Sequence, residues 1–324
     1  MRRRRLVATS TAMLLAPALA CAQGQAARPV RIGYLSAFEA PDRDVDALRA
    51  GLRTFGHVEG ASYTLEIRYA ERRLDRFGAL LDELLATGIA VLAVGGAAWQ
   101  VASRAGQRVP VVFAMSGDPV EAGIIASLPR PGGNVTGISF LALDLVPKRL
   151  SLLKEAAPGI RRVGVVSNPQ HAGERNERRV TEEAAHELGI EIVYRQIRDE
   201  ADIVPALAAI RDAGCDGLTA FPEALTSAAA ARLADFAIEN AMPSVFGWRN
   251  FAAAGGLMSY GPVRHDTYAR MGYFIDRILR GARPADLPAE LPRSIELVIN
   301  QRTARRLDLT IPHILASRAD EVIE

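Results

Sequence analysis

The chain has 324 residues, of which 49% are hydrophobic and 23% charged. This is the composition of a globular protein, and the length predicts about two domains. The formal net charge is +2, but the arginines at positions 2 to 5 supply four positive charges, so the rest of the chain carries −2. Nucleic-acid binding depends on clustered lysines and arginines that displace counterions from the phosphates. This chain has no such basic stripe, which argues against nucleic acid as a partner.

The first 22 residues, MRRRRLVATSTAMLLAPALACA, combine a basic start, a short apolar stretch and small residues at the end. This order predicts a signal peptide over 1–22 and a mature protein in the periplasm. Two processing routes are open, because Ala18, Ala20 and Ala22 fit ordinary cleavage whereas Cys21 could be lipidated and anchor the protein. Ala18 stands where lipoprotein signals usually carry leucine, which favours the soluble form.

Short β-rich runs then alternate with amphipathic helical stretches. The predicted strands of the first half are 30–35, 63–68, 89–94 and 109–113, with helices at 44–55, 75–86 and from 97 onward. The pattern starts again with a helix at 145–155. It continues with strands at 162–166, 190–195, 217–221, 244–246 and 257–260 and helices at 175–188, 201–213 and 224–240. The fold class is therefore α/β, with two doubly wound Rossmann-like lobes joined by a hinge.

Four further elements follow the second sheet: a helix at 265–279, a proline-rich loop, a strand at 295–299 and a short helix from 302. Elements that come after a complete sheet suggest that the chain returns to the first lobe. We therefore expect lobe I to comprise 28–138 and about 263–324, and lobe II to comprise 139–262.

The segment SGDPVEAGIIASLPRPGGNVTG, residues 116–137, follows the fourth strand. It lacks the Gly-Lys-Ser/Thr of a phosphate loop, and no G-x-G-x-x-G follows the first strand. Asp118 stands at a strand end where open α/β sheets bind ligands, or it caps a helix over 120–128. Residues 130–137, RPGGNVTG, are interpreted as the first crossing between lobes, where glycine and proline permit hinge motion.

Catalytic and metal-binding patterns are weak. Ser116 does not lie in a G-x-S-x-G elbow, and the sequence places no histidine beside it. The five histidines are scattered, without an i, i+4 pair or neighbouring cysteines. We expect no metal, no cofactor and no enzyme activity.

Two groups of residues are candidates for a binding site. Gly95 and Gly96 at a strand-to-helix turn could leave backbone N–H groups free for an anion, or simply form a tight turn. In the second half, aromatic and charged residues end the strands, and they either line a cleft or plug the sheet edge. These residues are Phe221, Glu223, Trp248, Arg249 and Tyr260.

Several blocks resemble the ABC-transporter substrate-binding proteins related to the tryptophan/tyrosine-binding type. These blocks are FAMSGDPV at 113–120, SLPRPGGNVTG at 127–137, AGGLMSYG at 254–261, LRGARPADLP at 279–288, ELVIN at 296–300, LTIP at 309–312 and RADEVIE at 318–324. The resemblance covers nearly all of the mature chain. It implies the type I periplasmic binding fold, with two similar lobes, three crossings and a ligand between them.

The resemblance also implies site residues and partners. It puts Asp118 at the D-P-V position and Thr136 at the N-x-T-G position, and it places Gly96 and Ala97 where members that bind aromatic amino acids tend to carry threonine. Glu223 stands where aspartate is common. The implied partners are a small-molecule ligand and an ABC permease in the inner membrane, and the implied state is a monomer. The whole expected binding set is Ser36, Gly96, Ala97, Asp118, Thr136, Phe221, Glu223, Trp248 and Tyr260.

The expected function is therefore capture of a small organic ligand, an amino acid or a similar metabolite, by hinge closure and its delivery to an ABC importer. Two other classes stay open, a periplasmic sensor for a membrane receptor and an α/β enzyme. A transcription regulator of the same fold is disfavoured, because an export signal occupies the place of its DNA-binding head.

We predict that isothermal titration against amino acids and small metabolites finds one ligand per chain, and that Asp118→Ala weakens its binding. The physical reason is loss of a carboxylate that accepts a hydrogen bond from the ligand. Unchanged affinity in the variant would remove Asp118 from the site.

Overall fold

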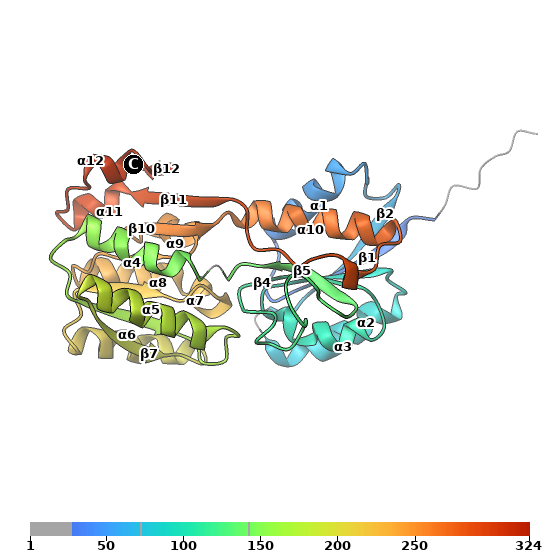
Figure 1. Ribbon diagram of the computed structural model, residues 1–324, viewed down its shortest axis with the longest axis horizontal. Coiled ribbons are helices and arrows are strands. Elements are labelled where there is room, and N and C mark those ends of the chain that lie inside the picture. The colour runs from blue at the N-terminus through green and yellow to red at the C-terminus, as the bar shows by residue number, and fades with distance from the viewer. Residues whose placement is uncertain (1–27, 72, 142) are drawn as a thin grey trace, which may run out of the picture.

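The computed structural model describes residues 28–71, 73–141 and 143–324, which form two α/β lobes side by side (Figure 1). This confirms the predicted fold class. Each lobe has a central sheet with helices on both faces, because its strands are buried on both sides and need apolar cover there.

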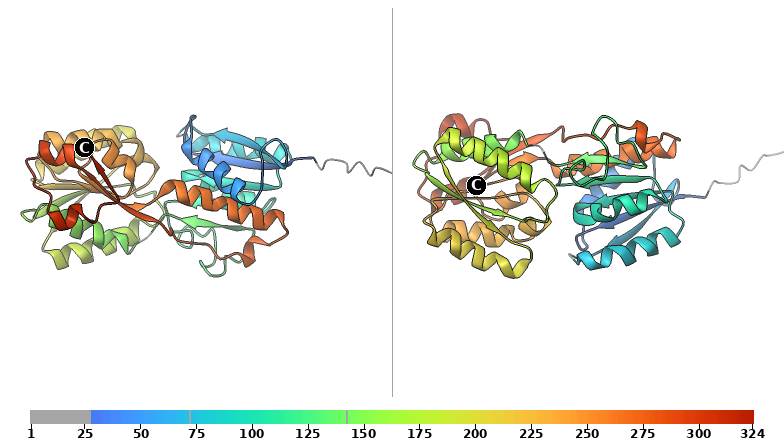
Figure 2. Two further views of the ribbon diagram at one scale, coloured as in Figure 1. Left: turned by 90° about the horizontal axis from the view of Figure 1, so that it is seen from above. Right: turned by 60° about the horizontal axis from the view of Figure 1, so that its bottom comes forward.

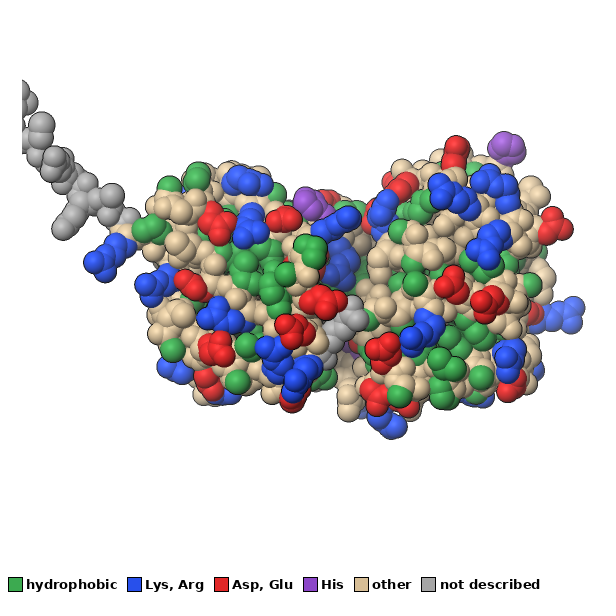
Figure 3. All heavy atoms as spheres, turned by 180° about the vertical axis from the view of Figure 1, so that it is seen from behind, with side chains coloured by type: hydrophobic (Ala, Val, Ile, Leu, Met, Phe, Trp, Pro, Cys, Tyr) green, Lys and Arg blue, Asp and Glu red, His purple; other side chains and the backbone are tan. Residues whose placement is uncertain are grey.

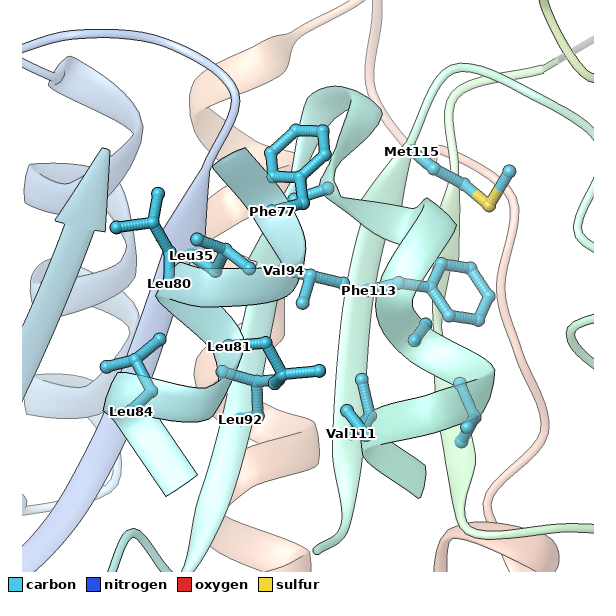
Figure 4. Packing of buried hydrophobic residues seen from close by; sticks show 14 of the residues in the cluster. Leu35, Phe77, Leu80, Leu81, Leu84, Leu92, Val94, Val111, Phe113 and Met115 are labelled. Carbon is cyan, nitrogen blue, oxygen red and sulfur yellow. The ribbon is translucent and has the colours of Figure 1, made fainter. Parts of the chain in front are cut away.

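The first sheet has five parallel strands in the order β2-β1-β3-β4-β5. Their bounds are β1 Val30–Ser36, β2 Tyr63–Tyr69, β3 Val91–Gly95, β4 Val111–Met115 and β5 Val135–Ser139. Helices α2 (Phe77–Ala86) and α3 (Ala102–Gly106) cover one face, and α1 (Arg43–Thr54) and α10 (Arg264–Leu279) cover the other. Figure 4 shows leucines of α2 packed on apolar side chains of β1, β3 and β4.

The second lobe is built from a parallel sheet, β7-β6-β8, and a mixed one, β12-β11-β10-β9. A bridge between Leu218 and Ser244 joins the two at β8 and β9. The strands are β6 Arg162–Ser167, β7 Glu191–Gln196, β8 Gly217–Ala220, β9 Val245–Phe246, β10 Met258–Pro262, β11 Ile295–Asn300 and β12 Glu321–Ile323.

Two helical layers cover this second sheet. On one face lie α4 (Leu145–Ala156), α5 (Glu174–Leu188), α11 (Gln301–Arg306) and α12 (His313–Ala316). On the other lie α6 (Ile203–Asp212), α8 (Ala230–Glu239) and α9 (Arg249–Ala253). The short helix α7 (Ala224–Ala228) follows β8, and short 3-10 turns occur at η1 Leu74–Arg76, η2 Gly96–Val101, η3 Glu200–Asp202 and η4 Pro284–Asp286.

The end of the chain divides between the lobes, which corrects the expected boundary. Helix α10 packs on α1 of the first lobe, but β11 pairs antiparallel with β10 and parallel with β12. The segment from residue 295 onward therefore belongs to the second lobe, and Figure 2 shows the C-terminus there. The position of β11 is decided by its hydrogen bonds to β10 of the second lobe, although β11 follows a helix of the first lobe in the sequence.

Two expectations for the segment after β4 are also wrong. Residues 120–128 form turns instead of a helix, and Gly123 has a left-handed φ of 69°, which ends a helical path. Residues 130–137 are not the first crossing, because Val135–Ser139 pair with β4 as an edge strand. The chain crosses between β5 and α4, and it crosses again between β10 and α10 and between η4 and β11.

Helices α1 and α10 touch through glycines. A Cβ added to Gly51 would lie 1.9 Å from the carbonyl oxygen of Ala269, and one added to Gly272 would lie 2.5 Å from the carbonyl carbon of Gly51. The backbones can approach this closely only because neither residue has a side chain.

We predict that Gly51→Ala lowers the free energy of unfolding by about 2 kcal/mol, because the methyl group must push the helices apart. Gly78→Ala in α2 is the matched control, since its Cβ would meet only the flexible Arg104 side chain at 3.4 Å. The control is expected to be neutral or slightly stabilising. Urea unfolding of both variants measures the difference, and equal stability would contradict the packing argument.

Candidate binding site between the lobes

A cavity of about 570 Å³ lies between the lobes. Its wall comes from loops at the carboxyl ends of strands in both sheets, where open α/β sheets bind ligands. The first lobe contributes residues that follow β1, β3 and β4, namely Ala37, Phe38, Ala97, Trp99, Gln100 and Ser116, together with Leu74 of η1. Figure 3 shows the surface narrowed between the lobes.

The second lobe contributes three loops to the same cavity. Asn168, Gln170 and His171 follow β6. Arg198, Asp199, Glu200 and Ile203 follow β7, and the stretch from Glu223 to Arg232 follows β8. Aromatic rings and polar groups thus share the cavity, as is usual for small-molecule sites of this size.

The first-lobe wall is shaped by short local bonds. The Ser36 hydroxyl accepts a hydrogen bond from the Phe38 backbone N–H at 3.1 Å, which fixes the turn after β1. Gly96 has a φ of 59°, and a Cβ there would lie 3.2 Å from the Phe38 ring. Ser36 and Gly96 therefore position the aromatic wall, while Ala97 lines the cavity directly.

Glu223 is the buried carboxylate of the cavity wall. Its carboxylate caps α7 by accepting a hydrogen bond from the Thr226 N–H at 2.7 Å. The Thr226 hydroxyl in turn accepts a hydrogen bond from the Glu223 N–H at 3.2 Å. Burial raises the pKa of Glu223, while the helix N–H groups and Asn168 lower it in part. The sequence located this residue correctly at the end of a strand, and it lines the cavity.

Of the nine expected residues, Ala97 and Glu223 line the cavity; Ser36 and Gly96 lie just behind its wall, and four others have different contacts. Thr136 donates to the Leu287 carbonyl at 2.7 Å and so ties η4 to β5. Phe221 packs in the second-lobe core against Tyr194. The ring centroid of Trp248 lies 5.9 Å from that of Phe140, beside the connections between the lobes. The Tyr260 carbonyl accepts a hydrogen bond from the Arg149 guanidinium at 2.8 Å.

Asp118 also lies outside the wall, at a contact between the lobes. Its carboxylate accepts from the N–H groups of Val120 and Glu121 at 2.8 and 3.2 Å, and its own N–H donates to the Ala172 carbonyl at 3.0 Å. The capping alternative therefore describes its side chain, although it caps a turn and not a helix. Its role in ligand binding stays a prediction.

His171 is a site residue that the sequence reasoning missed. Its Nε2 lies 3.1 Å from the Ser116 hydroxyl, so the two side chains meet across the cavity. The available signal was its position five residues beyond the predicted strand 162–166, and a similar position after a predicted strand would have found Phe38 and Trp99. No residue spacing reveals that loops after β4 and β6 belong to facing lobes.

The other nitrogen of His171 faces Glu177 of α5. Nδ1 and the Glu177 carboxyl oxygen Oε2 are 3.6 Å apart, both side chains are almost fully buried, and neither atom has a hydrogen-bond partner in the described residues. Burial lowers the pKa of His171 to about 4 and raises the pKa of Glu177 to about 8. At neutral pH the pair is therefore an imidazole beside a carboxylic acid.

The tautomer of the neutral imidazole decides which group donates in the contact with Ser116. With its hydrogen on Nε2, His171 donates to Ser116 Oγ; with its hydrogen on Nδ1, the Ser116 hydroxyl donates to Nε2. The two side chains are bonded in both tautomers.

Within residues 28–71, 73–141 and 143–324, every helix is too short or too polar to cross a membrane. The same residues contain no group of three histidine, cysteine, aspartate or glutamate side chains that could hold a metal ion.

The His171–Glu177 pair predicts how stability changes with pH. Between pH 6.5 and 8 the folded pair holds a proton that the unfolded chain has released, so stability falls as pH rises, by about 2 kcal/mol. Below pH 6.5 the shifts of the two groups offset each other, because unfolded histidine takes up the proton that unfolded glutamate lacks.

Urea unfolding at both pH values should show the fall in the wild type and its absence in Glu177→Gln. Glu183→Gln, an exposed acid on the same helix paired with Arg179, is the control and should follow the wild type. A fall that persists in Glu177→Gln would disprove the assignment.

Comparisons with known proteins agree with this architecture. A model of the family described as ABC transporter substrate binding protein matches residues 34–323. The chain is 23% identical over 256 residues to a tyrosine-binding protein of Clostridioides difficile, covering 78% of this chain and 73% of that protein. It is 25% identical to a conserved domain protein from Vibrio cholerae, with a TM-score of 0.84, covering 90% of this chain and 99% of that one.

Two further solved structures differ in their state. The ABC domain from Streptococcus pneumoniae in complex with L-Trp has a TM-score of 0.84 at 22% identity, covering 91% of this chain and all of that one. The ligand-free, open structure of a substrate-binding protein from Clostridium difficile has a TM-score of 0.70 at 21% identity, covering 91% and 99%. The match over residues 34–323 shows that this chain belongs to the ABC transporter substrate-binding protein family.

Proposed function

We propose that the protein captures a small organic ligand, an amino acid or a similar metabolite, between its lobes and delivers it to an ABC importer. The observation that carries this proposal is the cavity of about 570 Å³ whose wall is shared by both lobes. Contacts from two bodies to one ligand stabilise their closed arrangement over the open one. The volume falls within the range of small-molecule sites.

Relatives support a ligand of the amino-acid kind. One is named for tyrosine binding and another is a complex with L-Trp. Phe38 and Trp99 offer ring faces to such a ligand, and Glu223 offers a carboxylate. Ala97 has no hydroxyl where aromatic-binding members tend to carry threonine, so the contacts to a ligand carboxylate differ here.

The arrangement of the lobes supports closure. At nearly equal identity and coverage, the TM-score is higher for the complex with L-Trp, 0.84, than for the ligand-free, open structure, 0.70. Four contacts join the segment after β4 to the loop after β6 and the start of α5, namely Ser116 to His171, Asp118 to Ala172, and Glu121 to both Arg175 and Asn176.

Ligand capture is a better account of the site than catalysis, although Ser116 and His171 meet. A serine nucleophile needs a base that accepts its proton. Such a base is held by a carboxylate bonded to its other ring nitrogen, but Glu177 Oε2 lies 3.6 Å from Nδ1 without a hydrogen bond, and burial raises the pKa of Glu177 to about 8. We therefore assign no enzyme activity to the site.

Export and assembly follow from the same proposal. The signal segment 1–22 and the alternative anchor Cys21 lie outside the described residues, and periplasmic location is inferred from their sequence. One chain supplies both walls of the cavity, which is consistent with action as a monomer that docks on a membrane permease.

We predict that Ala97→Leu weakens binding of the identified ligand by roughly tenfold or more, because the larger side chain enters the cavity. The ligand is identified by native mass spectrometry of protein purified from its own cell, and affinity is measured by isothermal titration. Ala61→Leu, at an exposed position in the same lobe away from the cavity, is the control. Equal affinity of both variants would place the site elsewhere.

A further inference from the structure

We propose that the hydrogen bond between Ser116 and His171 is the latch that holds the lobes together. The proposal rests on closure of the lobes as part of the proposed function. It concerns the ligand-free equilibrium between closed and open arrangements, so it can be tested without a ligand.

The latch joins two loops that belong to different lobes. Ser116 follows β4, His171 follows β6, and their polar atoms are 3.1 Å apart at the cavity wall. The backbones approach closely beside them, since a Cβ on Gly117 would lie 2.4 Å from the Ala172 carbonyl oxygen. A bond between separate bodies exists only while they are in contact, so it counts wholly towards the closed arrangement.

Burial makes this bond stronger than the exposed ion pair across the same edge. The His171 side chain is 4% exposed, whereas Arg175, which pairs with Glu121 at 2.9 Å, is 84% exposed. An exposed ion pair contributes little because water and salt screen it. A buried donor that loses its acceptor, by contrast, leaves an unpaired polar group.

Glu177 of α5 lies behind His171. Its Oε2 is 3.6 Å from the Nδ1 of His171, and neither atom has a hydrogen-bond partner in the described part of the chain. The bonded ring nitrogen of His171 is Nε2, which faces Ser116 of the opposite lobe.

The groups around the latch explain a pH dependence. Glu174 of α5 also faces His171, and Arg149 of α4 and Glu223 before α7 face Glu177. Opening would hydrate His171 and return its pKa towards the ordinary value of 6.5, from about 4 when closed. The open arrangement then takes up a proton as pH falls from 6.5 to 4, so the closed arrangement loses stability over that range.

Small-angle X-ray scattering of the dialysed full-length mature protein tests the latch through its radius of gyration. At pH 7 the wild type should match the value calculated from the structure, and Ser116→Ala should be larger. We expect the closed-to-open ratio to fall about threefold to tenfold, the usual value of one hydrogen bond. Ser116→Thr keeps the hydroxyl and should behave as the wild type, and Arg175→Ala is the control that should leave the radius unchanged.

The same measurement at pH 5 separates the latch from general packing. The wild type should expand, whereas His171→Gln should stay compact at both pH values, because its amide N–H can reach Ser116 and does not titrate. Nitrogen-15 spectra of the histidine ring at pH 7 should show a neutral imidazole at His171.

Two results would overturn the proposal. They are a wild type already expanded at pH 7, or a radius that is equal in Ser116→Ala and the wild type. Neither depends on whether a ligand has been found, so failure of the latch and failure of the proposed function are distinguishable.

Discussion

The close contact between α1 and α10 is the constraint on which the rest of the structure depends. Helix α10 comes after nearly all of the second sheet in sequence, yet it packs on the first lobe through Gly51 and Gly272. The chain must therefore cross from β10 to α10 and back again to β11. Together with the connection after β5, this gives three connecting segments between the lobes. These segments keep the lobes close to each other, while the facing loops remain separate parts of the chain.

The facing loops become a site because parallel strands end at one edge of each sheet. The wall residues follow β1, β3 and β4 in one lobe and β6, β7 and β8 in the other. Strand direction alone brings these loops together, whatever residues they carry. Ligand choice then depends on side chains such as Phe38, Trp99 and Glu223, which can change without altering the fold.

Two buried titratable groups, His171 in this wall and Glu177 behind it, cost stability. Burial lowers the pKa of His171 and raises the pKa of Glu177, so that each is neutral near pH 7. An apolar pair of the same size would avoid that desolvation. What the polar pair supplies is an imidazole whose Nε2 lies 3.1 Å from the Ser116 hydroxyl of the opposite lobe.

The sequence by itself determined the α/β class, most strands and helices, and Glu223 as a wall residue, because hydrophobic periodicity and strand ends are local properties. It did not reveal β5, the position of β11, or the meeting of Ser116 with His171. Those features depend on partners distant in sequence: β4 for β5, β10 for β11, and the opposite lobe for Ser116. Only the tertiary structure decided these features. Segments distant in sequence form hydrogen bonds where the path of the chain brings them together, and the residues next to each segment do not encode that path.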